Sequence, residues 1–395
     1  MSTEAYWPIS ANNLNPPICS HMKNLFLTNL LFFLLVACQQ EYVVIKVTNS
    51  LDFDRREEMV EVNIRQLNVD FAEKKYLLND HKGQEIAYQL LRDNNQVYAL
   101  IFQADIPAHS SVEYKFIEGT PAEVTSKTHA RYVPERKDDF AWENDLSVYR
   151  MYGPALAGEN PSNGVDLWLK RTADLIVDKF YHDELVDGLS YHVDHGLGLD
   201  CYTVGHTLGA GGIAPYTDKL WIGDHYNRFA VIENGPLRSV FALTYDSVKV
   251  SHDYYTQTIT ITVDAGSLLN KAVVRYEGAN QPMKLAGGIV LHNGEGDRYT
   301  DPENQLIAYA ENAVSNAGIA SGRNYVGVYL PQKEVQIKEE ANHLLIMNDY
   351  KPGTEFVYYF GGGWSQWHYP TDKAWFDAMV RFSQTKTSPL QVVLL

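Results

Sequence analysis

The segment QTITITV at residues 257–263 alternates apolar and polar side chains, as do RSVFALTYD at 238–246 and KAVVRYE at 271–277. A period of two predicts β-strands that bury one face. Comparable strands are predicted at 42–47, 58–64, 97–103, 111–117, 324–330 and 355–364. The chain is therefore predicted to be mainly β, with mainly antiparallel sheets.

The expected architecture is a large antiparallel β-sandwich whose long loops border a shallow groove, a shape that suits an extended saccharide. Residues 42–120 are expected to form a small N-terminal β-sandwich, or else the first strands of the larger one, and GTPAEVTSK at 119–127 a linker. Residues 121–395 then form the main domain. One helix is expected, at 371–384, with Thr371 or Asp372 as its N-cap.

The composition limits the partners of the chain. Its 395 residues carry a formal net charge of −16, and 45% of them are hydrophobic. Nucleic acid is not expected as a partner, because phosphate binding requires a basic surface. An acidic sugar is compatible with this charge, since it requires only a local group of arginines or lysines. The three cysteines do not predict a disulfide framework.

The N-terminal residues are typical of a bacterial lipoprotein. Met22 and Lys23 precede a short apolar run, and LVAC at 35–38 resembles a lipobox in which Cys38 is lipidated. Residues 22–38 are then a signal peptide, and residues 1–21 an upstream extension from a mis-assigned start. The alternative is a short uncleaved membrane anchor. Either way, we expect a chain tethered in the periplasm or on the outer-membrane surface, touching the membrane only through its anchor.

The segment GLSYHVDHGLGLDCYTVGHTLGAGG at 188–212 is rich in polar residues and glycine. His192, His195 and Asp200 could together bind a divalent metal ion. In a regular strand, however, the two histidines point to opposite faces. We therefore expect no cofactor, with a divalent metal ion as the alternative.

An acid/base role for His192 or His195 is the favoured interpretation of this segment, with Tyr191 or Tyr152 as the second proton carrier. The alternative is a structural histidine that is hydrogen-bonded to the backbone. The glycines that follow lack the lysine of a phosphate-binding loop and are read as a turn. His206, next to them, could reach the same groove.

The segment RYVPERKDDFAWEND at 131–145 supplies the other expected wall of the site. Arg131 or Arg136 could bind a uronate carboxylate, Trp142 could stack on a sugar ring, and Glu143 could act as an acid or base. A solvated loop held by salt bridges is the alternative. Further substrate-binding candidates are Asn163, His225 and Trp364.

Several motifs resemble one bacterial family, the domain of unknown function 4861. They are RYVPERKDDFAWEND, YGPAL, NPSNGVDLWLKR, YHVDHGLGLDCYTVG and ENGPLRSVFALTYD. The resemblance extends from about residue 42 to the C-terminus. It implies lipoproteins of polysaccharide-utilisation systems with a galactose-mutarotase-like supersandwich. It implies no set of catalytic residues, so the site assignments above rest on the residues alone.

These observations together predict a carbohydrate-active lipoprotein that acts on uronic-acid-containing, pectin-like oligosaccharides. The chemistry would be that of a lyase, a hydrolase or a uronate isomerase, since each requires a base, an acid and a group that binds the carboxylate. The alternative is a non-catalytic glycan-binding lipoprotein, in which exposed aromatic side chains dominate.

Overall fold

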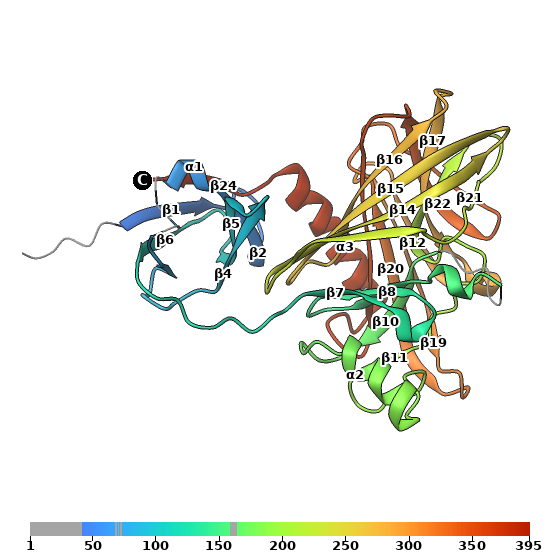
Figure 1. Ribbon diagram of the computed structural model, residues 1–395, viewed down its shortest axis with the longest axis horizontal. Helices are drawn as coiled ribbons and strands as arrows, with labels where there is room; N and C mark the ends of the chain where they lie inside the picture. The colour runs from blue at the N-terminus through green and yellow to red at the C-terminus, as the bar shows by residue number, and fades with distance from the viewer. Residues whose placement is uncertain (1–41, 68, 70, 72, 159–163) are drawn as a thin grey trace, which may run out of the picture. The chain divides into compact units, whose positions relative to one another are not determined.

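The computed structural model describes residues 42–395 apart from 68, 70, 72 and 159–163 (Figure 1). Its strands pair in antiparallel sheets, and a long helix lies near the C-terminus. The predicted mainly β fold with antiparallel sheets and a C-terminal helix is thereby confirmed. Among the described residues, every helix is too short or too polar to cross a membrane.

The N-terminal region forms a sandwich of two sheets, with strand orders β24-β1-β6-β3 and β2-β5-β4. Ile45, Leu100, Phe102 and Phe116 belong to a buried core that is separate from the core of the later strands. The elements are β1 (Tyr42–Thr48), β2 (Arg55–Asn63), α1 (Ile64–Leu67), β3 (Tyr76–Asn79), β4 (Tyr88–Asp93), β5 (Gln96–Ile106), β6 (Ser111–Glu118) and β24 (Gln391–Leu394).

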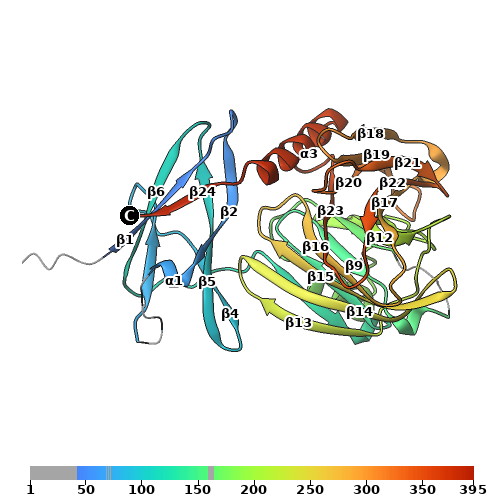
Figure 2. The same ribbon diagram turned by 90° about the horizontal axis from the view of Figure 1, so that it is seen from above.

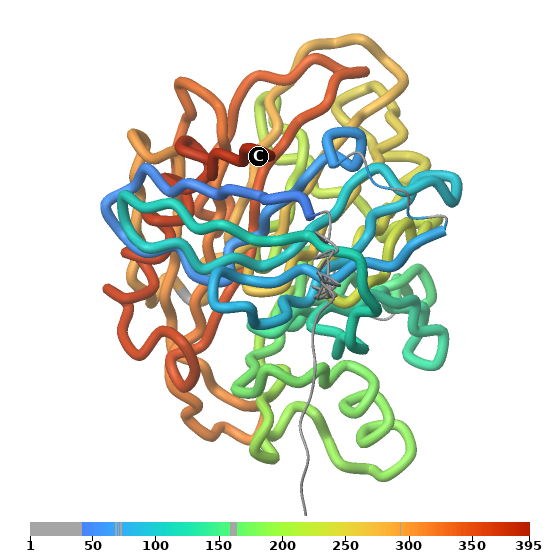
Figure 3. The backbone as a smooth tube through the Cα atoms, turned by 90° about the vertical axis from the view of Figure 1, so that its left-hand side faces the viewer, coloured from blue at the N-terminus to red at the C-terminus, as the bar shows by residue number. Residues whose placement is uncertain are grey.

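The C-terminal strand β24 pairs with β1, so the end of the chain lies beside the first described strand (Figures 2 and 3). The sequence-based division placed residues 391–394 with the main domain. The segment 119–127, predicted as a linker, contains no helix or strand.

The remaining strands form three sheets that share one core. Phe140 and Leu167 come from the first sheet, Phe241 and Phe360 from the second and Leu285 from the third. The first, of order β11-β10-β9-β8-β7, consists of β7 (His129–Val133), β8 (Asp139–Glu143), β9 (Val148–Met151), β10 (Asp166–Lys170) and β11 (Gly198–Asp200).

The second sheet has eight strands in the order β13-β14-β15-β16-β23-β20-β19-β18. They are β13 (Arg228–Asn234), β14 (Arg238–Val250), β15 (Asp253–Asp264), β16 (Asn270–Gly278), β18 (Asp297–Asp301), β19 (Leu306–Val314), β20 (Ala320–Tyr329) and β23 (Phe356–Trp364). The third, of order β12-β17-β22-β21, consists of β12 (Ala210–Tyr216), β17 (Met283–Val290), β21 (Gln336–Glu340) and β22 (His343–Tyr350).

The predicted C-terminal helix is α3 (Asp372–Thr387), and Thr371 caps it by accepting a hydrogen bond from the Ala374 amide. Its buried Trp375 and Met379 pack against Tyr325 of β20. A second helical segment was not predicted. It consists of α2 (Val177–His182) and the π-helical turn η3 (Asp183–Asp187). The short 3-10 turns are η1 (Pro134–Arg136), η2 (Pro154–Leu156) and η4 (His292–Gly294).

Two local predictions were wrong. A solvated loop, the alternative considered for residues 131–145, is wrong, because β8 within this segment is fully buried. The histidines of the segment 188–212 were considered on a regular strand, but 191–197 form turns and, before β12, only 198–200 form a strand, β11. The argument that strand geometry sends His192 and His195 to opposite faces therefore does not apply.

Candidate active site

The five-stranded sheet buries a different chemistry on each face. Side chains alternate along its strands, so Phe140, Trp142, Leu167 and Leu169 point into the shared core. The opposite face is also buried, yet it carries charges at Asp139, Glu143, Arg150, Asp166, Lys170 and Asp200. Residues 171–197, which include α2, cover this face and contribute Val177, Phe180, Tyr181 and Tyr191 to a small core with Trp168.

Arg150 lies at the centre of the charged face, with its side chain only 2% exposed. Its Nε donates to Asp166 Oδ2 at 2.9 Å, and its Nη2 lies 2.7 Å from the same oxygen. Nη2 also donates to Asp200 Oδ2 at 2.8 Å, and Nη1 lies 3.6 Å from Asp139 Oδ2. The strand register explains this convergence, because Arg150 is the direct cross-strand partner of Asp166.

Aromatic side chains surround the Arg150 guanidinium, whose carbon lies 4.7 Å from the ring centre of Tyr152, 5.0 Å from that of Trp168 and 5.7 Å from that of Tyr191. The hydroxyl oxygens of Tyr152 and Tyr191 each accept a hydrogen bond from Arg150, at 3.2 and 3.1 Å. Each phenol therefore keeps its own proton available for donation. Burial raises the pKa of both tyrosines, so they stay protonated at neutral pH.

Gly198 brings Asp200 to the cluster. Its φ of +141° suits glycine, and a Cβ at this position would lie 2.0 Å from the Leu169 carbonyl oxygen. This close approach lets β11 pair with β10, which sets Asp200 opposite Trp168. A larger residue at 198 would push β11, and with it the Asp200 carboxyl, away from Arg150.

The cluster contains more acids than bases. Three carboxyls, those of Asp139, Asp166 and Asp200, face two guanidiniums, those of Arg150 and Arg136. Burial raises the pKa of Asp139 to about 6, and burial together with the neighbouring Asp166 raises the pKa of Asp200 well above its ordinary value. Asp139 and Asp200 therefore hold a proton more tightly than a solvent-exposed aspartate does, although both lie near the Arg150 guanidinium.

Three side chains connect the cluster to solvent. His192 is 31% exposed, and its Nδ1 lies 3.0 Å from the Asp200 backbone oxygen. A carbonyl oxygen can only accept, so Nδ1 carries the proton and the lone pair of neutral His192 is on Nε2. Arg136 is 24% exposed, but its Nη1 is buried, lies 4.0 Å from Asp139 Oδ2 and has no hydrogen-bond partner among the described residues. Tyr152 is half-buried.

Glu143 and Lys170 form a second buried pair on the same face, at 2.8 Å. Glu143 also accepts hydrogen bonds from the amides of Ile176 and Val177 at the start of α2, and Lys170 donates to the Asn144 carbonyl. Every charge in this pair is satisfied internally. Glu143, predicted as an acid or base, thus holds α2 in place and is 0% exposed.

The structure brings together five of the residues singled out from the sequence, namely Tyr152, Tyr191, His192, Asp200 and Arg136. Others lie apart from one another. His195 is exposed and lies 3.0 Å from the Ser190 oxygen through its Nε2. His206 is exposed in the loop after β11, and His225 is buried in the segment before β13. Cys38 and Asn163 lie outside the described residues.

Three predicted substrate contacts have other partners in the structure. Trp142 is 0% exposed, stacks on Tyr149 in the shared core and donates to Asn270. Trp364 is also buried and donates to the Ser321 carbonyl. Neither ring can stack on a sugar. Arg131 is engaged by Glu135 and by Asp178 of α2.

Cys201 is half-buried, and burial raises the pKa of its thiol to about 12, so it is no nucleophile.

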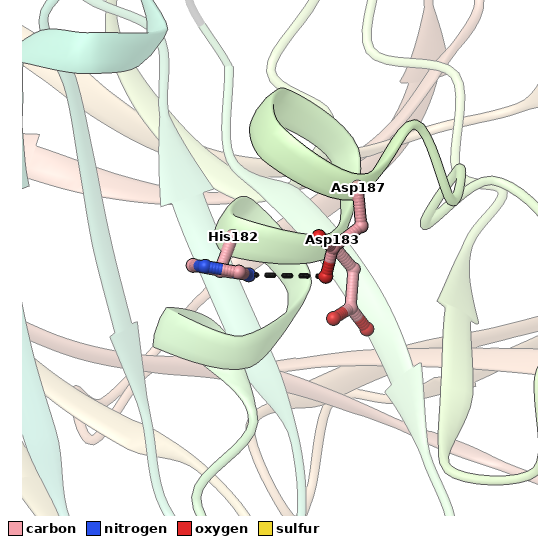
Figure 4. A group of neighbouring side chains, drawn as sticks. All are labelled: His182, Asp183 and Asp187. Carbon is pink, nitrogen blue, oxygen red and sulfur yellow. Dashed lines mark ion pairs between the residues drawn. The ribbon is translucent and has the colours of Figure 1, made fainter.

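Within the described part of the chain, one group of side chains has metal-ligating spacing, and it is not the predicted one. His182, Asp183 and Asp187 lie close together on α2 and η3 (Figure 4). Asp183 is already paired with Lys179 at 2.7 Å, and His182 with Asp187 at 3.3 Å. Exposed acidic groups of this kind are common on helices, so we assign no metal to them. His192, His195 and Asp200 do not form such a group.

Arg150, the centre of the site, was missed in the sequence. A signal was present, because the charged residues of DFAWE, VYRMY and DLWLK all lie on one face of their strands, and the residues on the other face are apolar or aromatic. Such an alternation in a strand that is apolar on its other face indicates that the charged face serves a purpose. High charge density was instead read as solvent exposure.

Comparison with known proteins gives a family and distant structural similarities. An uncharacterized protein, P7, of Formosa agariphila is 27% identical over 373 residues, covering 89% of this chain and 93% of that protein. Two solved structures from Enterococcus faecalis overlap 90% of the chain, with TM-scores of 0.44 and 0.41 and identities of 9% and 8%. They are a protein of glycosyl hydrolase family 38 and an alpha-mannosidase.

The chain spans about half the length of those two structures, 47% and 46% respectively. The sequence profile described as Domain of unknown function (DUF4861) matches residues 47–392. The protein whose strands carry the Arg150 cluster therefore belongs to the DUF4861 family.

Proposed function

We propose that the protein is a carbohydrate-active enzyme that performs acid/base chemistry on oligosaccharides containing uronic acid. The observation that carries this proposal is the solvent-facing rim of the Arg150 cluster. There a histidine with a free Nε2, a protonated phenol and the part-exposed guanidinium of Arg136, whose buried Nη1 lacks a hydrogen bond, lie around a single arginine. These are the base, the acid and the carboxylate-binding group that such chemistry requires.

The chemistry that uses all three groups is β-elimination. Arg136 binds the uronate carboxylate and neutralises it, which makes the proton on C5 more acidic. His192 Nε2 removes that proton, and Tyr152 donates its own to the oxygen that leaves C4. The C5–H and C4–O bonds break, and a C4–C5 double bond forms. Hydrolysis and uronate isomerisation use the same groups but add water or move a double bond.

The runner-up, a non-catalytic glycan-binding protein, has less support in the structure. It relies on aromatic rings that sugars can reach, but Trp142 and Trp364 are both buried. It also leaves the raised pKa values of Asp139 and Asp200 without a role. Perturbed carboxyl groups beside a half-exposed histidine are typical of active sites rather than of lectin surfaces.

We further propose that Cys38 is lipidated and tethers the enzyme in the periplasm or on the outer-membrane surface. The lipobox-like LVAC and the polar QQE after it support this assignment. Mass spectrometry of the membrane-extracted protein should find an acylated N-terminal cysteine. A Cys38→Ala chain that stays in the membrane fraction would contradict this proposal.

The activity test compares two histidines from the same turn. Purified protein is incubated with pectic oligosaccharides, and both the absorbance of unsaturated uronate and the product mass are followed. His192→Gln should lower turnover by about 10²–10⁴-fold, the usual contribution of a general base. His195→Gln is the matched control and should leave turnover unchanged, because its side chain lies outside the cluster.

Arg136 is tested with a change in the substrate. Arg136→Met should raise KM on the uronate substrate but not on a carboxyl-reduced analogue, since the analogue has no charge for the guanidinium to bind. Measurable binding with no product from any substrate would overturn the enzyme proposal in favour of glycan binding. Equal effects of Arg136→Met on both substrates would overturn the role assigned to Arg136.

A further inference from the structure

A cavity of about 420 Å³ lies outside the Arg150 cluster and shares no residue with it. Its lining comes from β2, from the end of β15 and the turn after it, from β23 and from α3. Residues of opposite charge and aromatic residues line it together, among them Arg55, Glu58, Asp264, Tyr359, Arg381 and Lys386. The volume is in the range of small-molecule sites and accommodates about two sugar units.

The cavity carries an excess of positive charge, although the chain as a whole is acidic. Its buried acids already have partners, since Glu58 pairs with Arg55 at 2.7 Å and Asp264 with Arg238 at 2.5 Å. By contrast, Lys271, Arg381 and Lys386 form no ion pair among the described residues. Six basic and five acidic side chains line the cavity, and the three cations without a direct ion pair create a local attraction for an anion.

Lys386 is the most deeply placed of these cations. Its Nζ lies 4.7 Å from the ring centre of Phe382 and 5.8 Å from that of Tyr359. Burial lowers the pKa of Lys386, and the nearby carboxylates of Glu58 and Asp264, already paired with arginines, offset only part of this lowering. A charged amine in this position lacks full hydration and a direct ion pair, so a bound anion would stabilise it.

The cavity lining combines cations, carboxylates and aromatic side chains, so it favours some kinds of anion over others. A phosphate or sulfate ion alone is best bound by donors only, and carboxylates close by would repel it. An acidic sugar is different, because its hydroxyls donate to carboxylates such as Glu58 and Asp264 while its ring packs on an aromatic side chain such as Tyr359. We propose that this cavity binds a uronic acid unit of an oligosaccharide as a second, non-catalytic site.

This proposal shares its ligand class with the proposed function but does not depend on it, because the two sites have no residue in common. The binding test uses trigalacturonate and its carboxyl-reduced, neutral counterpart, titrated calorimetrically into the full chain. Lys386→Met and Arg381→Met should each weaken the second site at least about tenfold, the loss expected for a hydrogen bond to a charged group. The neutral trisaccharide should not bind there.

The matched control is Lys373→Met, which removes an exposed lysine from the same helix, α3. It should leave binding unchanged. Arg136→Met should remove binding at the Arg150 cluster only. If Lys386→Met and Arg381→Met bind trigalacturonate like the wild type, the second site is refuted while the proposed active site stands. If Arg136→Met alone leaves binding unchanged, the proposed active site is refuted while the second site stands.

A second measurement needs no variant. An amine-acylating reagent should label Lys386 readily at neutral pH, because a lowered pKa leaves more of the amine unprotonated. Peptide mass spectrometry should show that trigalacturonate slows labelling at Lys386 and leaves labelling at Lys373 unchanged. Equal labelling rates with and without the trisaccharide would contradict binding in the cavity.

Discussion

Two groups of buried charges lie on the same face of the five-stranded sheet, and they differ in how completely they are satisfied. The Lys170–Glu143 pair has one acid, one base and hydrogen bonds to backbone groups on both sides. The Arg150 cluster has more acids than bases, an unused donor on Arg136 and a histidine at its rim. The Lys170–Glu143 pair, whose charges are all satisfied, holds α2 in place. The Arg150 cluster has an excess of acids and side chains that reach solvent, so it can exchange protons with a ligand.

The largest expected effect is that of removing Arg150. Arg150→Met leaves three buried carboxyls without their shared cation, and breaking such a network costs about 3–5 kcal/mol of unfolding free energy. Urea denaturation measures the loss. The matched control is Arg228→Met, which breaks an exposed ion pair with Asp246 and should cost less than about 1 kcal/mol. Similar losses in the two variants would show that Arg150 does not organise the cluster.

For the Lys170–Glu143 pair, a double substitution should be less destabilising than the loss of Lys170 alone. Lys170→Met alone leaves the Glu143 carboxylate buried without its cation and should lower the free energy of unfolding by about 3–5 kcal/mol. Adding Glu143→Leu should recover much of that loss. Full recovery is not expected, because Glu143 also accepts from two amides at the start of α2, bonds worth about 1 kcal/mol. A double variant as unstable as the sum of the two single variants would show that the residues act independently.

The same comparison explains which parts of the fold could be predicted from the sequence. Strands such as 257–263 were predictable because one face is apolar and the other polar, and α3 because Thr371 caps a helical repeat. Residues 139–143 were not, because charge normally indicates exposure, whereas here Asp139 and Glu143 are neutralised by Arg150 and Lys170 from other strands. Strand pairing is nonlocal, so the local pattern could indicate a charged face but not the partners that neutralise it.

The candidate site was predicted in part for the same reason. Tyr191, His192 and Asp200 lie close in the sequence and meet in the structure. Arg150 joins them only because β9, β10 and β11 are neighbours in the sheet. Trp142 and Trp364 were assigned to sugar binding by residue type alone, and burial, which residue type does not reveal, gives them other partners.

A smaller effect is expected from the titration of Asp139. Its pKa is raised to about 6 in the folded protein, above its ordinary value near 3.8. A raised pKa means that the folded state binds the proton more tightly, so this contribution to stability is complete below about pH 4 and is lost as the pH rises through about 6. The loss amounts to at most about 3 kcal/mol.

Asp139→Asn isolates that contribution from the carboxyls with lowered pKa, such as Asp372 and Glu135, which act in the opposite direction. Unfolding free energies of both proteins are measured from about pH 4 to about pH 7. The wild type should lose stability relative to the variant across this window. Parallel curves would mean that Asp139 ionises in the folded state as it does in the unfolded chain.

The smallest effect is expected from chelation. Carboxyl groups that gather in a protein require compensation by a metal ion, a protein cation or a proton, and in the Arg150 cluster Arg150 and Arg136 lie beside them. The exposed group of His182, Asp183 and Asp187 has Lys179 as its partner. A chelator should therefore leave both melting temperature and turnover unchanged. Loss of turnover that a single added ion restores would instead place a metal beside His192.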